Sequence, residues 1–248
     1  MIVGIDIGNT TVEFGIIRGE EIVSFKFASD RDKTVDDWLI NIDFVVKDEK
    51  PMDILISSVV PPIEEKVEKA FLKYFGKSPL IIGRDVKIPI KINYENEKEV
   101  GIDRLVNAYA GLKLFKPPFI VIDLGTAITF DVVNEKGEYD GGMIFPGMET
   151  SIDTLFSKTA KLPKVKLEKP KILIGKNTVG SIQSGIYYGY ISLIEGMVEK
   201  ISAYYKFNFS IILTGGHSYL ISSGLNIKHK VVEKLSMLGI KFLAEEML

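Results

Sequence analysis

Short apolar runs separated by glycine-containing turns fill the first sixty residues of the chain. Their spacing predicts three strands in a meander and then a helix, whose start is marked by a capping box of Thr34 and Asp37. A fourth apolar run is stopped by Pro61-Pro62, and apolar residues at helical spacing then lead to Gly76, a residue typical of helix ends. The predicted order is three strands, helix, strand, helix, strand, with strands over 1–7, 11–17, 21–27 and 53–60 and helices over 35–48 and about 63–75.

The rest of the chain repeats this alternation of strands and helices. A helix leads through Pro117-Pro118 into paired strands, and a Gly- and Pro-rich segment over 141–147 separates these strands from the next helix. A long helix, a buried strand followed at once by Gly215-Gly216, and a closing amphipathic helix complete the pattern. The predicted ranges are 119–124, 127–133 and 210–213 for strands and 103–115, 147–159, 177–205 and 235–248 for helices.

An internal repeat is the most informative feature of this pattern. Residues 3–11 and 120–128 both consist of an apolar strand that ends in Asp, followed by an apolar residue, Gly and a small polar residue. The two acids are Asp6 and Asp123, and 123 − 6 = 117 residues separate them, close to half of the chain. The repeat predicts two copies of one unit, residues 1–117 and 118–248, with the boundary at the Pro-Pro pair.

Composition narrows the possible functions without identifying one. The 248 residues are 46% hydrophobic and 26% charged, and 31 Lys and Arg against 33 Asp and Glu give a net charge of −2. This balance predicts neither nucleic acid nor membrane as a partner. The sequence has no cysteine, which excludes disulfides, thiolate zinc sites and a cysteine nucleophile. The N-terminus does not have the pattern of a signal peptide, and no uncharged apolar run reaches 18 residues, so we expect a cytoplasmic protein.

The first candidate site is the turn that contains Asp6, Gly8, Asn9 and Thr10. A carboxylate at a strand end, a glycine turn with accessible backbone amides, and short polar side chains together suit phosphate and its Mg²⁺ ion. The same residues would also serve in an ordinary hairpin turn. Recurrence of the pattern at Asp123 favours the phosphate-binding interpretation, because a simple turn does not need its Asp and Gly repeated.

The second candidate site is Asp103-Arg104, which follows Gly101 where a helix begins. An acid in the first helical turn is favourable for structural reasons alone, because it lies beside the positive end of the helix. In the functional interpretation, Asp103 is a general base for a hydroxyl group and Arg104 binds an anionic substrate. The sequence pattern by itself leaves both interpretations open.

These features resemble those of the acetate and sugar kinase, heat-shock ATPase and actin superfamily, in which two ribonuclease-H-like halves each supply a phosphate loop. The resemblance implies an α/β fold of duplicated halves, each a mixed five-stranded sheet with flanking helices. A closer resemblance, to type III pantothenate kinases, rests on nine short motifs that stand in the family's order and span nearly the whole chain. The motifs are Asp6-Ile-Gly-Asn-Thr10, Ser57-Ser-Val-Val-Pro-Pro62, Asn93-Tyr-Glu-Asn96, Gly101-Ile-Asp-Arg104, Asp123-Leu-Gly-Thr-Ala127, Pro146-Gly147, Thr159-Ala-Lys-Leu-Pro163, Gly175-Lys-Asn-Thr178 and Thr214-Gly-Gly216.

The closer resemblance implies a homodimeric kinase that phosphorylates pantothenate with ATP to 4′-phosphopantothenate, the first step of coenzyme A synthesis. It implies that Asp103 accepts the proton of the pantothenate hydroxyl and that Asp123 binds K⁺ or NH₄⁺. Asp6 would hold Mg²⁺ on the ATP phosphates, largely through water. The implied ATP-binding residues are Asp6, Ile7, Gly8, Asn9, Thr10, Thr11, Val12, Glu13 and Thr126, and the implied substrate-binding residues are Tyr94, Gly101, Ile102, Asp103, Arg104 and Thr178.

One position departs from the family pattern, because residue 102 is Ile where Ala is common. The added bulk could reshape the wall of the substrate pocket, but it leaves Asp103 and Arg104 in place.

Two other functions stay open. One is a ribonuclease-H-like nuclease with Asp6 and Asp123 as metal-binding acids, which the near-neutral charge and the four arginines do not favour. The other is a non-catalytic regulator that binds nucleotide on the same scaffold.

Overall fold

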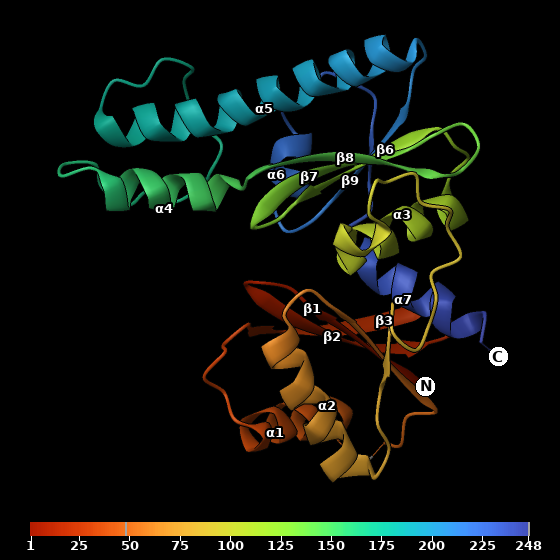
Figure 1. Ribbon diagram of the computed structural model, residues 1–248. Helices are drawn as coiled ribbons and strands as arrows, with labels where there is room; N and C mark the ends of the chain where they lie inside the picture. The colour runs from red at the N-terminus through yellow and green to blue at the C-terminus, as the bar shows by residue number, and fades with distance from the viewer. Residues whose placement is uncertain (48, 248) are drawn as a thin grey trace. The chain divides into compact units, whose positions relative to one another are not determined.

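The computed structural model describes residues 1–47 and 49–247, which form two compact units (Figure 1). The first unit contains Met1–Leu114 and the residues from Lys234 onward, and the second contains Phe115–Glu233. This division differs from the predicted one at 117/118 mainly in the closing helix, which belongs to the first unit. Its packing partners, described below, explain the difference.

The first unit is built on a five-stranded mixed sheet with the strand order β3-β2-β1-β4-β5. The first three strands form the predicted antiparallel meander, while β4 pairs parallel to β1 and β5 pairs parallel to β4. The strands are β1 (Ile2–Ile7), β2 (Thr11–Arg18), β3 (Glu21–Ala28), β4 (Asp53–Ser58) and β5 (Leu80–Ile81). The strands predicted from alternation in this half are confirmed within one or two residues at each end.

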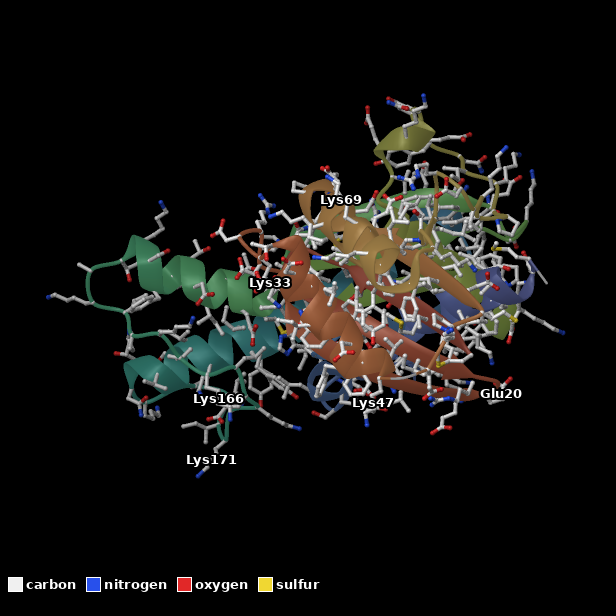
Figure 2. The ribbon with its side chains drawn as sticks, turned by 90° about the horizontal axis from the view of Figure 1, so that it is seen from below. Glu20, Lys33, Lys47, Lys69, Lys166 and Lys171 are labelled. Atoms are coloured by element: carbon white, nitrogen blue, oxygen red, sulfur yellow. The ribbon has the colours of Figure 1, made fainter. Side chains whose placement is uncertain are left out.

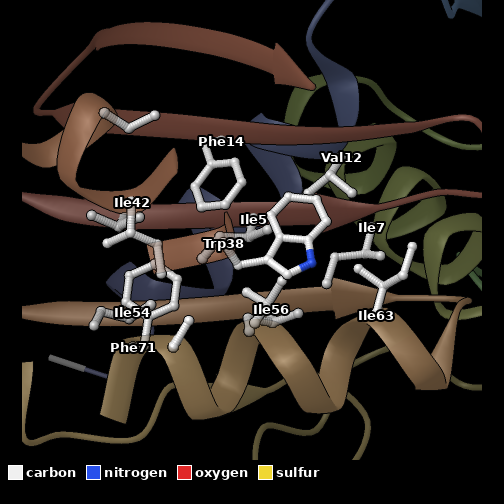
Figure 3. Close-up of a cluster of buried hydrophobic side chains, with 14 of the residues drawn as sticks. Ile5, Ile7, Val12, Phe14, Trp38, Ile42, Ile54, Ile56, Ile63 and Phe71 are labelled. Atoms are coloured by element: carbon white, nitrogen blue, oxygen red, sulfur yellow. The ribbon is translucent and has the colours of Figure 1, made fainter. Parts of the chain in front are cut away.

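Helices cover both faces of this sheet. On one face, α1 (Val35–Val46) and α2 (Pro61–Phe75) pack their apolar sides on alternate residues of β1, β2 and β4, and Trp38 and Phe71 lie fully buried beside Phe14 (Figure 3). The Thr34–Asp37 capping box starts α1, and Gly76 ends α2 in the left-handed conformation with φ 67°. On the other face lie α3 (Ile102–Leu114), preceded by the short 3₁₀ helix η1 (Glu97–Glu99), and α7 (Leu235–Glu245).

The closing helix α7 fits against the first sheet because glycines remove the side chains that would obstruct it. A Cβ atom at Gly4 would lie 2.9 Å from Cγ2 of Ile240, and one at Gly15 would lie 2.7 Å from the sulfur of Met237. Within α7, a Cβ atom at Gly239 would lie 2.6 Å from the carbonyl oxygen of Val106 in α3. Helix α7 therefore packs on β1, β2 and α3, which assigns it to the first unit.

The second unit repeats the architecture with the strand order β10-β9-β6-β7-β8. Its strands are β6 (Phe119–Leu124), β7 (Ala127–Val133), β8 (Tyr139–Pro146), β9 (Ser210–Thr214) and β10 (Lys230–Val231). Its helices are α4 (Met148–Lys158), α5 (Thr178–Tyr205) and α6 (Ser218–Ser222). The apolar side of α5 covers one face of this sheet, where Tyr187, Ile191 and Ile194 are buried. In Figure 2, Lys166 and Lys171 mark the polar segment that joins α4 to α5.

The Gly- and Pro-rich segment over 141–147, for which no strand was predicted, lies almost entirely in strand β8. It pairs antiparallel with β7 at the edge of the sheet, and the register shifts between Asp131 and Val133. Gly141 has φ 97°, a conformation that other residues rarely adopt, so glycine marks an irregular edge strand here rather than a loop. Strand β10 and helix α6 were not predicted, because each is too short to show a periodic pattern of hydrophobic residues.

The two sheets have the same topology, which confirms the predicted duplication. In each, a central strand pairs antiparallel with the next strand in sequence and parallel with a later one. Strands β1 to β5 of the first unit correspond in order to β6 to β10 of the second. The fold class is therefore the predicted one, with two mixed five-stranded sheets and flanking helices.

Candidate active site

The turn between β1 and β2 is held by its own backbone. The Gly8 amide donates to the Thr11 carbonyl oxygen at 3.0 Å, and a Cβ atom at Gly8 would lie 3.3 Å from the same oxygen. The side chains of Asn9 and Thr10 are exposed at its tip. The strand ends therefore carry a tight turn that presents short polar groups, as a phosphate loop requires.

A serine from the end of β3 reinforces this turn. The Ser29 hydroxyl donates to the Gly8 carbonyl oxygen at 2.6 Å, and the Ser29 amide donates to the Thr10 carbonyl oxygen at 2.9 Å. Ser29 was not predicted as a site residue, because it lies outside every motif. Only the strand register brings it to the turn, since Thr11 pairs with Ala28.

Asp6 lies on the face of the first sheet that α3 and α7 cover. Burial raises the pKa of Asp6 to about 7, and the negative charge of Asp103 on α3 acts in the same direction. The Ser236 and Ser57 hydroxyls lower this pKa in part, and Glu13, which pairs with Asp6 across β1 and β2, raises it slightly. The first unit thus brings the predicted Asp6, Glu13 and Asp103 into one polar cluster.

Asp103 begins α3 in a geometry that glycine makes possible. A Cβ atom at Gly101 would lie 2.5 Å from Oδ1 of Asp103, so a larger residue at 101 would displace the carboxylate. The same Oδ1 accepts a hydrogen bond from the Arg104 amide at 2.8 Å. Burial raises the pKa of Asp103, and the Arg104 amide and charge offset part of this rise. Asp103 therefore fits both interpretations given above. Its carboxylate accepts an amide of the first helical turn, as a structural acid would, and its charge also acts on Asp6.

The structure places the side chain of Ile102 against the protein's own core. A Cβ atom at Gly83 would lie 2.6 Å from Cδ1 of Ile102, and Gly83 has φ 92°. Ile102 packs against the buried cluster that includes Val86 and Val106. The bulk that departs from the family pattern is thus accommodated by a glycine at position 83.

The remaining predicted substrate residues belong to different units. Tyr94 lies before η1 in the first unit and is 39% exposed. Thr178 is the exposed first residue of α5 in the second unit. Asn177 caps this helix by accepting the Gly180 amide at 2.8 Å, so the helix start that carries Thr178 is well defined.

The second strand end, at Asp123, is surrounded by closely packed backbone. The Gly125 amide donates to the Ala127 carbonyl oxygen at 3.1 Å, which repeats the bond of the first turn. A Cβ atom at Gly215 would overlap Oδ1 of Asp123, and Gly215 has φ 87°. The second unit thus brings the predicted Asp123 and Thr126 together with the Gly215-Gly216 segment.

The start of α4 closes this second loop. The Gly147 amide and the Thr150 hydroxyl both donate to the Thr126 carbonyl oxygen, at 2.9 Å and 2.8 Å. A Cβ atom at Gly147 would overlap the carbonyl oxygens of Gly125 and Thr126. The Pro146-Gly147 motif therefore has a direct role, which is to let α4 begin against the loop that carries Thr126.

The acidic side chains of the described residues do not form a ready-made metal site. Within residues 1–47 and 49–247, His, Asp and Glu side chains do not form a group of three or more that could hold a metal ion. A single partly buried carboxylate suits Mg²⁺, which usually keeps several waters and takes its other ligands from substrate phosphates.

Within residues 1–47 and 49–247, no helix is long and apolar enough to cross a membrane.

Two comparisons with known proteins give the same family. The family model described as type III pantothenate kinase matches residues 2–200. The chain is also 57% identical over 249 residues to a type III pantothenate kinase from Sulfurihydrogenibium sp. (strain YO3AOP1), with 98% of this chain and 99% of the relative covered. The chain belongs to the type III pantothenate kinase family. This confirms the family resemblance expected from the nine motifs.

Solved structures support the fold of this type III pantothenate kinase family member. A protein from Campylobacter jejuni assigned to the Baf family of transcriptional activators has a TM-score of 0.63 at 19% identity, with 99% of this chain and 98% of that chain covered. A protein from Sinorhizobium meliloti assigned as a 2-dehydro-3-deoxygalactonokinase has a TM-score of 0.60 at 12% identity, with 100% and 99% covered. At these identities the likeness shows the shared fold alone.

Proposed function

We propose that this chain catalyses the ATP-dependent phosphorylation of pantothenate to 4′-phosphopantothenate, the first step of coenzyme A biosynthesis, with Asp103 as the proton acceptor. Family membership gives the reaction, a phosphoryl transfer that needs a divalent metal. The observation that supports the assignment of Asp103 is its place in the first turn of α3, which covers the face of the sheet that holds Asp6; burial there raises its pKa. A carboxylate of raised pKa is a better base for a hydroxyl proton than an ordinary one.

Asp103 would take the proton of the attacking hydroxyl as the bond to the γ-phosphate forms. Its Oδ1 accepts the Arg104 amide, so we expect Oδ2 to take the proton. Gly101 keeps the space beside Oδ1 free of a side chain. Arg104, Tyr94 and Thr178 would bind pantothenate, together with the backbone of Gly101 and Ile102.

The turn from Asp6 to Glu13 would bind the ATP phosphates. The residues present fit a Mg²⁺ ion, because burial and neighbouring acids raise the pKa of Asp6 to about 7 and a nearby cation would stabilise its charged form. When bound, Mg²⁺ would neutralise charge on the β- and γ-phosphates. Asp6 would hold it largely through water, while the exposed Asn9 and Thr10 and the backbone of Gly8 bind phosphate oxygens.

The turn at Asp123 would bind a monovalent cation, K⁺ or NH₄⁺, and Thr126 would contact ATP. The surroundings fit such an ion, because glycines at 125 and 215 let backbone atoms approach the Asp123 carboxylate closely. The Asp123 carboxylate would supply an oxygen ligand and a negative charge to such an ion. The cation would supply additional positive charge near the phosphates.

A homodimer is the proposed assembly. Large apolar side chains are exposed on α4 and on the segment that leads into α5, and Ile174 reaches 67% exposure. Such surfaces mark protein contacts more often than free surface. The exposed residues are Leu155, Phe156, Ile172, Leu173, Ile174 and Val179. Sedimentation equilibrium tests this assembly, and Ile174→Asp should shift a wild-type dimer toward monomer.

The central experiment incubates the purified chain with Mg-ATP and pantothenate, with either K⁺ or Na⁺ as the only monovalent cation. Mass spectrometry should detect phosphopantothenate with K⁺ and little with Na⁺. Equal product with both ions would contradict the role of Asp123 while leaving the reaction intact. ATP binding without product under any cation would identify a non-catalytic regulator, and cleavage of branched or hybrid nucleic acids would identify a nuclease. A cytoplasmic location, without nucleic-acid or membrane partners, stays a prediction.

A further inference from the structure

A buried hydroxyl stands beside Asp6 without a role in the fold. Ser57 is the residue of β4 that pairs with Asp6 in the parallel register, so both side chains lie on the same face of the sheet. Ser57 is fully buried, and its Oγ has no hydrogen-bond partner among the residues that the structure describes. Its proximity nevertheless lowers the pKa of Asp6.

A buried hydroxyl without a partner is unfavourable, and alanine would fill the same space without leaving a polar group unbonded. The hydroxyl can donate to the carboxylate of Asp6 after a rotation about one side-chain bond, because hydroxyl groups turn to suit their acceptors. A charged Asp6 is the acceptor that would make this bond strong. Ser57 therefore fits a function that depends on the charged form of Asp6.

The same arrangement occurs in the second sheet. Thr214 of β9 pairs with Asp123 of β6 in the parallel register, and Thr214 is 3% exposed. The backbone repeats as well, because the Val59 amide donates to the Ile7 carbonyl oxygen at 3.0 Å and the His217 amide donates to the Leu124 carbonyl oxygen at 3.3 Å. A hydroxyl at this register position therefore accompanies each acidic strand end.

A second hydroxyl reaches Asp6 from the closing helix. Ser236 lies in the first turn of α7, close enough to Asp6 for its hydroxyl to lower the pKa of that carboxylate. The glycine contacts that seat α7 on β1 and α3 fix the position of this serine relative to the strand. Asp6 is thus held from two elements that the sequence separates by about 180 residues, since 236 − 57 = 179.

We propose that Ser57 and Ser236 are positioning residues that orient the Asp6 carboxylate toward the metal of the metal–nucleotide complex. The proposal rests on the proposed function in that it takes Asp6 as the acid that holds the metal. Neither serine contacts the reacting atoms. Removal of either should weaken metal binding while the interaction with pantothenate is kept, because outer hydrogen-bond partners of metal-holding groups tune metal affinity.

The test compares Ser57→Ala, Ser236→Ala and Ser57→Thr with Ser58→Ala as the matched control. Ser58 is the next residue of β4, its side chain lies on the opposite face of the sheet, and its Oγ accepts the Val60 amide at 3.2 Å. Threonine is the residue at the corresponding position 214, so Ser57→Thr should keep the hydroxyl in place. Thermal melts establish that each variant is folded.

Binding of Mn²⁺ in the presence of a non-hydrolysable ATP analogue is measured by the loss of the free Mn²⁺ electron paramagnetic resonance signal. The two alanine variants should bind Mn²⁺ about 10- to 100-fold more weakly, with Ser57→Thr and Ser58→Ala near wild type. In pantothenate kinase assays, the same variants should need more Mg²⁺ for half-maximal rate while the KM for pantothenate is unchanged.

Mn²⁺ affinity in Ser57→Ala and Ser236→Ala equal to that of Ser58→Ala would overturn the proposal. If Ser57→Ala does not fold, Ser236→Ala carries the test, because Ser236 is only partly buried and its truncation leaves no core cavity. A wild-type protein that binds Mn²⁺ with the analogue but does not phosphorylate pantothenate would refute the proposed function alone. Wild-type protein that does not bind Mn²⁺ would overturn the serine proposal directly.

Discussion

The two acidic strand ends share one topology but have different surroundings. Asp6 lies where α3 and α7 cover the sheet, and its neighbours are the side chains of Asp103, Glu13 and two serines. Asp123 has Thr214 beside it in the strand register, and Gly125 and Gly215 bring the chain close to its carboxylate. The first copy of the duplicated unit thus has a cluster of acids, while in the second copy a glycine-rich segment packs against the acid.

This difference is consistent with the proposed roles of the two acids, Asp6 toward a divalent cation and Asp123 toward a monovalent one. A cluster of like charges disfavours ionisation and is stabilised by a divalent cation, which concentrates charge. A single carboxylate carries less negative charge and would suit a monovalent ion. Duplication supplied two equivalent turns, and it is the elements packed beside each turn that distinguish them.

The largest expected effect tests the acid that only the first copy has. Asp103→Asn should lower kcat about 10²- to 10⁴-fold, because the hydroxyl proton loses its acceptor, while the fold and ATP binding are kept. Steady-state kinetics and nucleotide titration measure the two quantities separately. Turnover near that of the wild type would remove Asp103 from its role.

The next test compares the glycines that shape the two loops. Gly147→Ala should destabilise the second unit by about 1 to 3 kcal/mol and weaken ATP binding, because the added Cβ overlaps two carbonyl oxygens of the backbone. Gly8→Ala should cost less, since its Cβ would lie 3.3 Å from one carbonyl oxygen. Thermal melts compare the stability of the two variants, and nucleotide titration compares their affinity for ATP.

Gly196→Ala is the control for these substitutions, because nothing lies within 4 Å of a Cβ atom at this position of α5. It should stabilise the protein by about 0.5 to 1 kcal/mol, since alanine is favoured over glycine inside a helix. If Gly147→Ala proved as stable as Gly196→Ala, the close approach of α4 to the second loop would be contradicted.

A pH experiment probes the charge cluster of the first copy. In metal- and nucleotide-free protein the pKa of Asp6 is about 7, above its value of 3.8 in the unfolded chain. Between these values the folded state binds the additional proton, so the contribution of Asp6 to stability falls as pH rises from about 4 to 7. Asp6→Asn should therefore melt about 2 to 4 °C above wild type at pH 8.

That difference should shrink as the pH is lowered toward 5, because the wild-type Asp6 is then protonated in the folded state. Differential scanning calorimetry in the presence of a chelator makes the measurement. The gain should disappear when Mg²⁺ and ATP are added, because only the wild type is stabilised through Asp6. A lower melting temperature for Asp6→Asn at pH 8 would contradict the charge cluster.

Sequence reasoning predicted most of this fold because its signals were local. Alternation predicted the central strands, the Thr34–Asp37 pair predicted the start of α1, and Gly76 predicted the end of α2. The repeat of Asp and Gly predicted the duplication, which the matching strand orders confirm. Strand β8 was missed because its glycines are typical of turns, and only pairing with β7 makes it a strand.

The site was predicted less completely than the fold. Residues within one motif, such as Asp103 and Arg104, are neighbours in the chain, so their proximity follows from the sequence alone. Ser57 stood within a family motif, but its position beside Asp6 depends on the strand register. Ser236 and the place of α7 in the first unit depend on Gly4, Gly15 and Gly239, whose partners are far away in the sequence.

The smallest expected effects concern two hydroxyl groups, each of which donates a hydrogen bond to one of the two turns from a neighbouring segment. Ser29 donates to the Gly8 carbonyl oxygen in the first copy, and Thr150 donates to the Thr126 carbonyl oxygen in the second. Ser29→Ala and Thr150→Ala should each cost about 0.5 to 1.5 kcal/mol of turn stability. Each should therefore raise the KM for ATP by roughly 2- to 10-fold, with kcat little changed.

Ser29→Ala and Thr150→Ala should also respond differently to Mg²⁺ and K⁺. Ser29→Ala loosens the turn that carries Asp6, so its effect on the KM for ATP should diminish as Mg²⁺ is raised. Thr150→Ala loosens the turn that carries Thr126 beside Asp123, so its effect should diminish as K⁺ is raised instead. Initial-rate measurements over a grid of both cations distinguish these responses. An identical dependence on both ions in the two variants would mean that the turns act as one site, and the contrast between the copies would then lie in their packing alone.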